Sequence, residues 1–267
     1  MKTDTVSPAM GIRVTGIDAH QVNEDLIGEL RRLLLKHHVV VIAGQSLHAE
    51  ELQAFGQAWG ELMTHPSGMN KNVPFVQTLA NKRSVRGRGL GAWHSDMTWH
   101  PTPPWITMLH ARKIPKWGGD TGYANQQLAW EALELGAKDR GRMFRRTLPT
   151  QEGLLGLCAL HTGKRFGANV PDSIHPIVRT HNETGKQALY VNPEFTSHIV
   201  DVTEEDSQNW LWPLWLHGTM FEFTYRHAWS PGDLVIWDNR SVMHTAILDY
   251  EDERIMQRVI LKGDTPV

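Results

Sequence analysis

The feature that most constrains the fold is a series of short strand patterns separated by turns, which begins near Trp105 and continues to the end of the chain. Runs rich in β-branched and aromatic residues, bounded by glycine, proline and polar clusters, are typical of β-sandwiches and barrels. We expect strands at 105–111, 176–180, 188–192, 221–228, 233–237 and 258–262. The sequence therefore predicts a mainly β protein, a sandwich or jelly roll with helical additions.

Helical periodicity appears in four places. In 23–38, leucine and isoleucine recur at helical spacing, and the apolar run 39–42 that follows directly reads as a buried strand. The other expected helices are 49–62, 126–135 and 204–217. Residues 64–93 are rich in glycine, asparagine, proline and basic residues, which predicts a loop. No repeat or linker divides the chain, so we expect a single domain over residues 1–267.

Charge and composition argue against several classes of protein. Lys and Arg total 27 against 29 Asp and Glu, so the net charge of −2 provides no general attraction for nucleic acid or an anionic membrane. The longest apolar run, 39–43, is far shorter than the roughly 20 residues that cross a bilayer. Residues 1–16 lack the pattern of a secretory signal, and the single cysteine, Cys158, cannot form an internal disulfide. We expect a soluble, cytoplasmic protein that binds neither nucleic acid nor membrane.

Three residues form a candidate metal site. His94 and Asp96 are two positions apart, so on a strand both side chains would leave the same face and could share an ion. His244 follows the expected strand at 233–237 and is a candidate third ligand. Two histidines and one carboxylate fit the facial triad of non-haem Fe(II) oxygenases, which leaves three positions open. The same residues could serve a zinc hydrolase, and each could equally be an ordinary core or surface group.

Two arginines near the C-terminus form a candidate anion site. Arg254 and Arg258 are four residues apart, so in an extended segment both project to one face, about 13 Å apart. A guanidinium can clamp a carboxylate through two parallel hydrogen bonds. Pairing of Arg254 with Glu251 or Asp252 is the structural alternative.

Taken together, these residues and several flanking motifs resemble the iron(II)/2-oxoglutarate dioxygenases typified by taurine dioxygenase and 2,4-dichlorophenoxyacetate dioxygenase, the TauD/TfdA family. The matching segments follow the same order over nearly the whole chain: 39–45, 59–62, 93–96, 118–121, 190–192, 237–239 and 254–258. The resemblance implies a double-stranded β-helix, that is, a jelly roll. It also implies that His94, Asp96 and His244 bind Fe(II), and that Thr121 and Arg254 hold the distal carboxylate of the co-substrate 2-oxoglutarate. The implied reaction uses O2, releases succinate and CO2, and hydroxylates a C–H bond.

The same resemblance suggests a substrate class. Arg258 stands where relatives often meet the acid group of the primary substrate or else support the co-substrate, and His65 stands where taurine-type relatives border the substrate. Leu90, Met97 and Phe195 would favour an apolar or aromatic body, with plain packing inside the barrel as the alternative. We expect a small organic acid, such as an aryloxyalkanoate or a natural aromatic acid. A sulfonate or alkyl sulfate is the alternative within the family. A zinc hydrolase and a non-catalytic jelly roll that binds an acid are the alternatives outside it.

One helix pattern concerns the whole molecule. The segment 204–217 carries three tryptophans, Trp210, Trp212 and Trp215, which is more apolar than a solvent-facing helix needs. These side chains pack on the core in one interpretation and form the contact of a homo-oligomer in the other.

Overall fold

Two sheets that face each other form the centre of the structure, a computed structural model that describes residues 1–66, 70–81, 92–139, 157–160 and 173–267. The larger sheet has the order β1-β2-β3-β14-β6-β16-β4, with β5 paired to β16. The smaller sheet has the order β13-β7-β15. Neighbouring strands are antiparallel except β2 and β3. This arrangement is the predicted jelly roll, and the expectation of a mainly β fold is confirmed.

The bounds of the strands show how short most of them are. The larger sheet contains β1 (Lys2–Thr5), β2 (Ile12–Thr15), β3 (Val39–Ile42), β4 (Leu62–Met63), β5 (Gln77–Asn81), β6 (Ile106–Lys113), β14 (Leu234–Asp238) and β16 (Arg254–Leu261). The smaller sheet contains β7 (Thr121–Asn125), β13 (Thr224–His227) and β15 (Val242–Ala246). Two further small sheets contain β8 (Leu157–Leu160), β9 (Ser173–Pro176) and β12 (Thr196–Ile199), and β10 (Val178–Thr180) and β11 (Gln187–Leu189).

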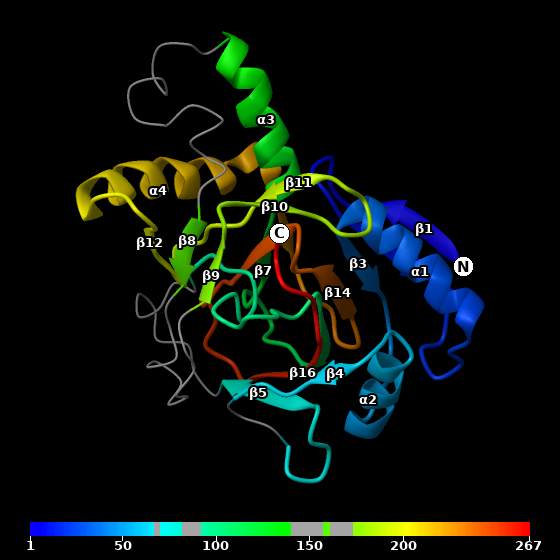
Figure 1. Ribbon diagram of the computed structural model, residues 1–267. Coiled ribbons are helices and arrows are strands. Elements are labelled where there is room, and N and C mark those ends of the chain that lie inside the picture. Colours follow the sequence, from blue (N-terminus) through cyan, green and yellow to red (C-terminus); the bar gives the residue numbers. More distant parts are fainter. Residues whose placement is uncertain (67–69, 82–91, 140–156, 161–172) are drawn as a thin grey trace.

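Helices cover the sheets from outside (Figure 1). Helices α1 (Glu24–His37) and α2 (Ala49–Gln57) lie along one side, where their leucines pack on the outer face of the larger sheet. Helices α3 (Gln126–Asp139) and α4 (Glu204–Gly218) lie at the top of Figure 1 and share a second apolar cluster with β10 and β11. A 3-10 turn at Phe221–Phe223 precedes β13.

The alternation of side chains along the strands separates a packed outer face from the interior between the sheets. On β14, Leu234 and Ile236 face α1 and α2, whereas Val235 and Trp237 face inward. On β16, Val259 and Leu261 belong to the outer cluster and Met256 to the inner one. Because side chains alternate with a period of two, Arg254 and Arg258 share the inward face with Met256. The interior thus receives chemistry-bearing residues from both sheets.

Several expected elements differ in their limits from those that form. Helix α2 ends at Gln57 and not at 62, because the chain turns through Gly60, whose φ of 149° a non-glycine residue rarely adopts, and Leu62 enters β4. The expected loop 64–93 contains strand β5, whose residues 77–81 pair along β16. β5 carries polar residues at several positions, so it gives no clear alternating pattern, and its pairing partner lies more than 170 residues away in register.

The N- and C-terminal limits of the other elements agree with expectation more closely. Helix α1 begins after Asn23, whose side chain accepts a hydrogen bond from the backbone N–H of Leu26, as an N-cap should. Strand β16 starts at Arg254, four residues before the strand expected at 258–262. Among the described residues, no helix combines the length and the apolar character that crossing a membrane requires. A single domain over 1–267 stays a prediction.

Candidate metal centre

A backbone bridge brings two of the three predicted ligands together. The N–H of His94 donates to the carbonyl oxygen of His244 at 3.0 Å, and the N–H of His244 donates to that of His94 at 2.7 Å. His244 lies on β15, whereas Asp96 lies in the turn that follows His94. His94 and His244, which are 150 positions apart in the sequence, are neighbours because a single antiparallel bridge joins His94 to strand β15.

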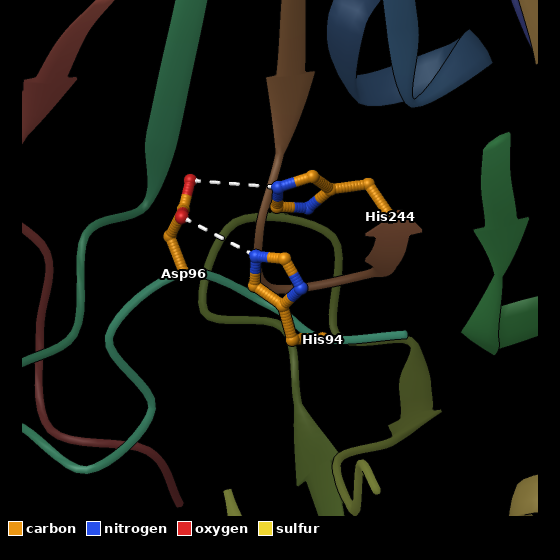
Figure 2. A group of neighbouring side chains, drawn as sticks. All are labelled: His94, Asp96 and His244. Atoms are coloured by element: carbon orange, nitrogen blue, oxygen red, sulfur yellow. Dashed lines mark ion pairs between the residues drawn. The ribbon is translucent and has the colours of Figure 1, made fainter. Parts of the chain in front are cut away.

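The three side chains point toward one another (Figure 2). His94 Nε2 lies 3.8 Å from Asp96 Oδ1, and His244 Nε2 lies 3.9 Å from Asp96 Oδ2. One ligand atom from each residue lies within 4.8 Å of the others. His94 is partly exposed, whereas Asp96 and His244 are buried, so the cluster opens to solvent on the His94 side.

The chemistry of these donors fits a divalent transition metal. His94 Nδ1 lies 2.8 Å from the carbonyl oxygen of Ala92, which makes Nδ1 the protonated nitrogen and leaves the Nε2 lone pair facing Asp96. Burial lowers the pKa of His244 to about 3, with the charge of His94 acting in the same direction. The His244 imidazole is thus neutral at neutral pH, as a metal ligand must be.

Asp96 is held as a carboxylate by its neighbours. Burial opposes its ionisation, but Arg258 and the two imidazoles outweigh burial and keep the pKa of Asp96 below its ordinary value. Arg258 Nη1 donates to Oδ1 at 3.0 Å, and Thr107 Oγ1 donates to Oδ2 at 2.5 Å. The carboxylate is charged and fixed in orientation before any ligand binds.

Asn239 fixes the turn that carries Asp96, and sequence reasoning did not assign it a role. Its Oδ1 accepts hydrogen bonds from the N–H of Asp96 at 3.2 Å and from Nε1 of Trp237 at 3.0 Å. Its Nδ2 donates to Thr107 Oγ1 at 2.9 Å. Because Thr107 accepts from Asn239, its own proton is available to Asp96. Neither Thr107 nor Asn239 could be assigned from spacing, since each becomes a partner of Asp96 only through strand pairing.

A buried ion cluster holds the turn between β14 and β15. The Asp238 carboxylate accepts from Arg240 Nη2 at 2.6 Å and lies 3.0 Å from His181 Nε2. Burial opposes ionisation of Asp238, but Arg240 and His181 keep its pKa below the ordinary value. Asn239 and His244 follow this anchored residue, so the turn presents both in fixed positions.

Arg254 and Thr121 form a second polar group inside the sheets. Arg254 Nε donates to the carbonyl oxygen of Gly119 at 3.0 Å, and Thr121 Oγ1 accepts from Nε1 of Trp229 at 3.0 Å. The Arg254 guanidinium carbon lies 5.8 Å from the centre of the Trp229 ring. Gly119 has φ +73°, and a Cβ there would lie 3.2 Å from Arg254 Cδ, so this turn admits the arginine because it has no side chain.

The charge of Arg254 has no carboxylate partner in the part of the chain that the structure describes, where it makes no ion pair with Glu251 or Asp252. The residue is only 6% exposed, and burial lowers its pKa. Arginine nevertheless stays charged in proteins. A buried, unpaired guanidinium is costly, so this pocket favours an anionic ligand.

The residues expected to bind substrate form a polar group at Arg258 and an apolar group at Met97 and Phe195. Arg258 Nε donates to Gln77 Oε1 at 2.9 Å, and Gln77 Nε2 lies 3.5 Å from His65 Nδ1. His65 and Arg258 are thus connected through Gln77, a residue of the unexpected strand β5. Met97 and Phe195 share an apolar cluster with Trp99 and Ile260. Leu90 lies outside the described residues.

Phe195 connects this apolar cluster to the candidate metal ligands. Its ring meets the His94 ring edge-on, with 5.6 Å between the ring centres. The backbone N–H of Phe195 donates to Asn192 Oδ1, whose Nδ2 donates to Thr98. The partly exposed His94 is therefore bordered by a fixed aromatic ring, and Arg258 contacts the Asp96 carboxylate of the same cluster.

A jelly roll whose interior holds two histidines, a carboxylate and a buried arginine pocket defines the class of non-haem dioxygenases that use a keto-acid co-substrate. A family model described as "Taurine catabolism dioxygenase TauD, TfdA family" matches residues 3–260. The chain belongs to this family, and it is an oxidoreductase.

Individual relatives are consistent with this assignment. A protein named alkylsulfatase from Acinetobacter baylyi is 30% identical, over 96% of this chain and 83% of the relative. The 2,4-dichlorophenoxyacetate dioxygenase of Cupriavidus pinatubonensis is 29% identical, over 89% of this chain and 90% of the relative. The crystal structure of a taurine dioxygenase from Burkholderia xenovorans superposes with a TM-score of 0.84 at 32% identity, covering 100% of this chain and 92% of that one. A zinc hydrolase and a non-catalytic binding module are thereby set aside.

Proposed function

We propose that the protein is an Fe(II)- and 2-oxoglutarate-dependent dioxygenase that hydroxylates a C–H bond of a small organic acid. The observation that carries the proposal is the convergence of His94, Asp96 and His244, together with a buried Arg254 that has no carboxylate partner among the described residues. Three protein ligands leave three positions of an octahedral ion for other ligands. When bound, Fe(II) supplies the oxygen chemistry, in which 2-oxoglutarate and O2 become succinate and CO2 as the substrate gains a hydroxyl group.

The chain's own residues hold and orient these components. His94, Asp96 and His244 would hold the ion, and Thr107 and Asn239 keep the Asp96 carboxylate in place. Arg254 and Thr121 would bind the distal carboxylate of 2-oxoglutarate. A charge-assisted pair in a buried site contributes more than a neutral hydrogen bond, so Arg254 would carry most of the affinity of this pocket.

Arg258 would bind the acid group of the primary substrate. Its Nη1 and Nε are engaged by Asp96 and Gln77, which orients the guanidinium. No hydrogen bond of Nη2 is present within the described residues, so this nitrogen is available to an incoming anion. His65, connected to Arg258 through Gln77, would border the same acid group.

Met97 and Phe195 would contact the body of the substrate, as would Leu90. The first two belong to an apolar cluster next to His94. An alkyl or aryl body suits such a surface, whereas a second charged group would lose its hydration there. We therefore propose an organic acid with an apolar or aromatic body, such as an aryloxyalkanoate or a natural aromatic acid.

A sulfonate or alkyl sulfate is the second candidate class, and the similarity to the Acinetobacter baylyi alkylsulfatase favours it. Its tetrahedral head group presents three oxygens to Arg258, whereas a carboxylate presents two. The two classes share an anionic head and an apolar body, so the residues named above serve either.

The test is to measure 2-oxoglutarate-dependent O2 uptake with Fe(II) while matched pairs of carboxylic, sulfonic and sulfate-ester compounds are supplied. We expect O2 uptake and succinate to rise together with a modified product for an acid with an apolar body. Arg258→Gln should raise the KM for that acid by about 10-fold or more and change the KM for the co-substrate by no more than about 2-fold. Arg32→Gln, on the exposed face of α1, is the control. Succinate formation that needs no 2-oxoglutarate or no metal would contradict the proposal.

A further inference from the structure

The hydroxyl group of Tyr123 lies in the protein interior and has no role in the site described so far. The side chain is fully buried, and among the described residues its hydroxyl group makes no hydrogen bond. Leaving a buried hydroxyl without a partner is unfavourable, so most buried tyrosines have one. The nearby Tyr225, by contrast, has its hydroxyl 2.8 Å from His227 Nδ1.

The position of Tyr123 relates it to both halves of the site. It lies on β7 directly opposite His244 on β15, and the two rings are stacked with centres 6.4 Å apart. Thr121 precedes it by two residues on the same strand, so both side chains leave the same face. Tyr123 therefore lies beside His244, a candidate metal ligand, and on the same strand face as Thr121 of the carboxylate pocket.

Charged groups of the site act on the Tyr123 hydroxyl across the interior. Arg254 and Asp96 both interact with it electrostatically, and the Thr121 side chain is near enough to offer it a hydrogen bond, although the geometry of the ligand-free protein does not complete one. Tyr123 in turn acts on the Arg254 guanidinium. The hydroxyl is thus within electrostatic reach of the arginine that has no carboxylate partner.

The hydrogen-bonding capacities of these groups indicate what is missing between them. The Arg254 guanidinium can only donate. Thr121 Oγ1 already accepts from Trp229 Nε1, which leaves its proton to donate. Burial raises the pKa of Tyr123 above its ordinary value, so the hydroxyl keeps its proton and can donate it. Apart from the bond of Arg254 Nε to Gly119, no acceptor is hydrogen-bonded to these three groups within the described residues, so the pocket favours a ligand rich in acceptor oxygens, such as a carboxylate.

We propose that the Tyr123 hydroxyl donates a hydrogen bond to 2-oxoglutarate, as a third donor beside Arg254 and Thr121 at its distal carboxylate. This inference rests on the proposed function, because it assigns an additional binding residue to the same co-substrate. The unpartnered hydroxyl destabilises the ligand-free protein and is satisfied only in the complex.

Tyr123→Phe tests this role, because it removes the hydroxyl and keeps the ring. Its affinity for 2-oxoglutarate, measured by anaerobic calorimetry on the Mn(II)-loaded protein, should fall by about 10- to 100-fold. Its melting temperature without ligands should equal or exceed that of the wild type, since no hydrogen bond is lost. Its affinity for Mn(II) should stay within about 2-fold. If the hydroxyl had only a structural role, Tyr123→Phe would instead lower the melting temperature.

Tyr225→Phe is the matched control, because it removes a hydroxyl that has a partner. It should lower the melting temperature and leave 2-oxoglutarate binding unchanged. If Tyr123→Phe binds 2-oxoglutarate as tightly as the wild type, the role of Tyr123 is wrong and the proposed function stands. If Tyr123→Phe melts lower and loses Mn(II) and 2-oxoglutarate together, the hydroxyl is structural and the inference is overturned. If the wild type itself binds no 2-oxoglutarate, the proposed function fails.

Discussion

At the scale of single residues, two charged side chains of the site are buried in different surroundings. Asp96 is a buried carboxylate whose charge is balanced by Arg258 at 3.0 Å. Arg254 is a buried guanidinium whose one hydrogen bond within the described residues goes to the backbone oxygen of Gly119. Because a buried charge without a partner is unfavourable, the first arrangement is complete without a ligand and the second is not.

Arg254→Ala therefore has a specific expected effect. It should weaken 2-oxoglutarate binding by about 10- to 150-fold, the equivalent of roughly 1.5–3 kcal/mol for a hydrogen bond to a charged group. In the ligand-free protein the loss of stability should be partly offset, because the bond to Gly119 is lost but a buried charge without a carboxylate partner among the described residues is removed as well. Steady-state kinetics with varied 2-oxoglutarate measures the first effect, and urea unfolding measures the second. An unchanged KM for the co-substrate would place the carboxylate pocket elsewhere.

Which residues of the site could be predicted depends on how each acquires its role. His94, Asp96, His244 and Arg254 are chemically distinctive, and their spacing and flanking motifs single them out. Thr107 and Asn239 are common residue types that meet Asp96 through contacts 11 and 143 residues apart in the chain. Tyr123 reads as a core aromatic until the surroundings of its hydroxyl are known. Motif spacing identifies ligands, whereas supporting residues need the strand register.

At the scale of elements, the junction between α1 and β3 depends on a buried histidine. His38 ends α1 in the left-handed conformation, with φ 65°, and its N–H donates to the carbonyl oxygen of Leu34 at 2.7 Å. Its Nδ1 lies 3.0 Å from Ser241 Oγ, in the turn that leads to His244. Burial lowers the pKa of His38 to about 4. The junction thus requires a neutral imidazole.

This junction should make the protein less stable in acid. The unfolded chain binds a proton at His38 near pH 6.5, whereas the folded chain does so only near pH 4. The contribution is therefore fully present above pH 6.5 and is lost as the pH falls toward 4, by about 1.4 kcal/mol per unit and about 3 kcal/mol in all.

His38→Asn tests this effect, because asparagine tolerates the left-handed conformation. Urea unfolding at pH 7 and pH 4.5 should show a smaller loss of unfolding free energy in the variant than in the wild type. His198→Asn, at an exposed position, is the control and should keep the wild-type pH dependence. Equal pH dependence of His38→Asn and the wild type would mean that His38 is not responsible.

Elements were predictable where local signals are strong. Helix α1 has an N-cap, an acidic first turn and a periodic apolar face, and β3 is continuously apolar. Strand β5 lacks such signals because it lies at the edge of β16, where polar residues are tolerated. Because the sequence did not predict β5, it also did not predict Gln77 of that strand, which connects His65 to Arg258.

At the scale of the whole molecule, the proposed ligands would connect the two sheets. His244 belongs to the smaller sheet, and Arg254 to the larger one. A ligand that binds only the folded state stabilises it by about 2.7 kcal/mol at 100 times its dissociation constant. Mn(II) with 2-oxoglutarate should therefore raise the melting temperature by about 5–10 °C. His244→Ala should show no such rise, and an equal rise in this variant would contradict the assignment of the ligands.

The exposed side chains of α4 bear on the expected homo-oligomer, which stays a prediction. Trp210 and Trp215 of α4 pack on the cluster shared with α3, as one of the two interpretations requires. Trp212 and Leu216, however, are 60% and 56% exposed on the same helix. A homo-oligomer that covers them stays a prediction, as does the cytoplasmic location.

The central claim is that one ferrous ion is held by two imidazoles and one carboxylate that strand pairing brings together. Anaerobic titration with Fe(II), followed by calorimetry, tests it most directly on the wild type, His94→Ala and Asp96→Ala, with circular dichroism as the check on folding. We expect one ion per wild-type chain and no measurable binding by either folded variant. Wild-type affinity for Fe(II) in a folded His94→Ala or Asp96→Ala would contradict the account.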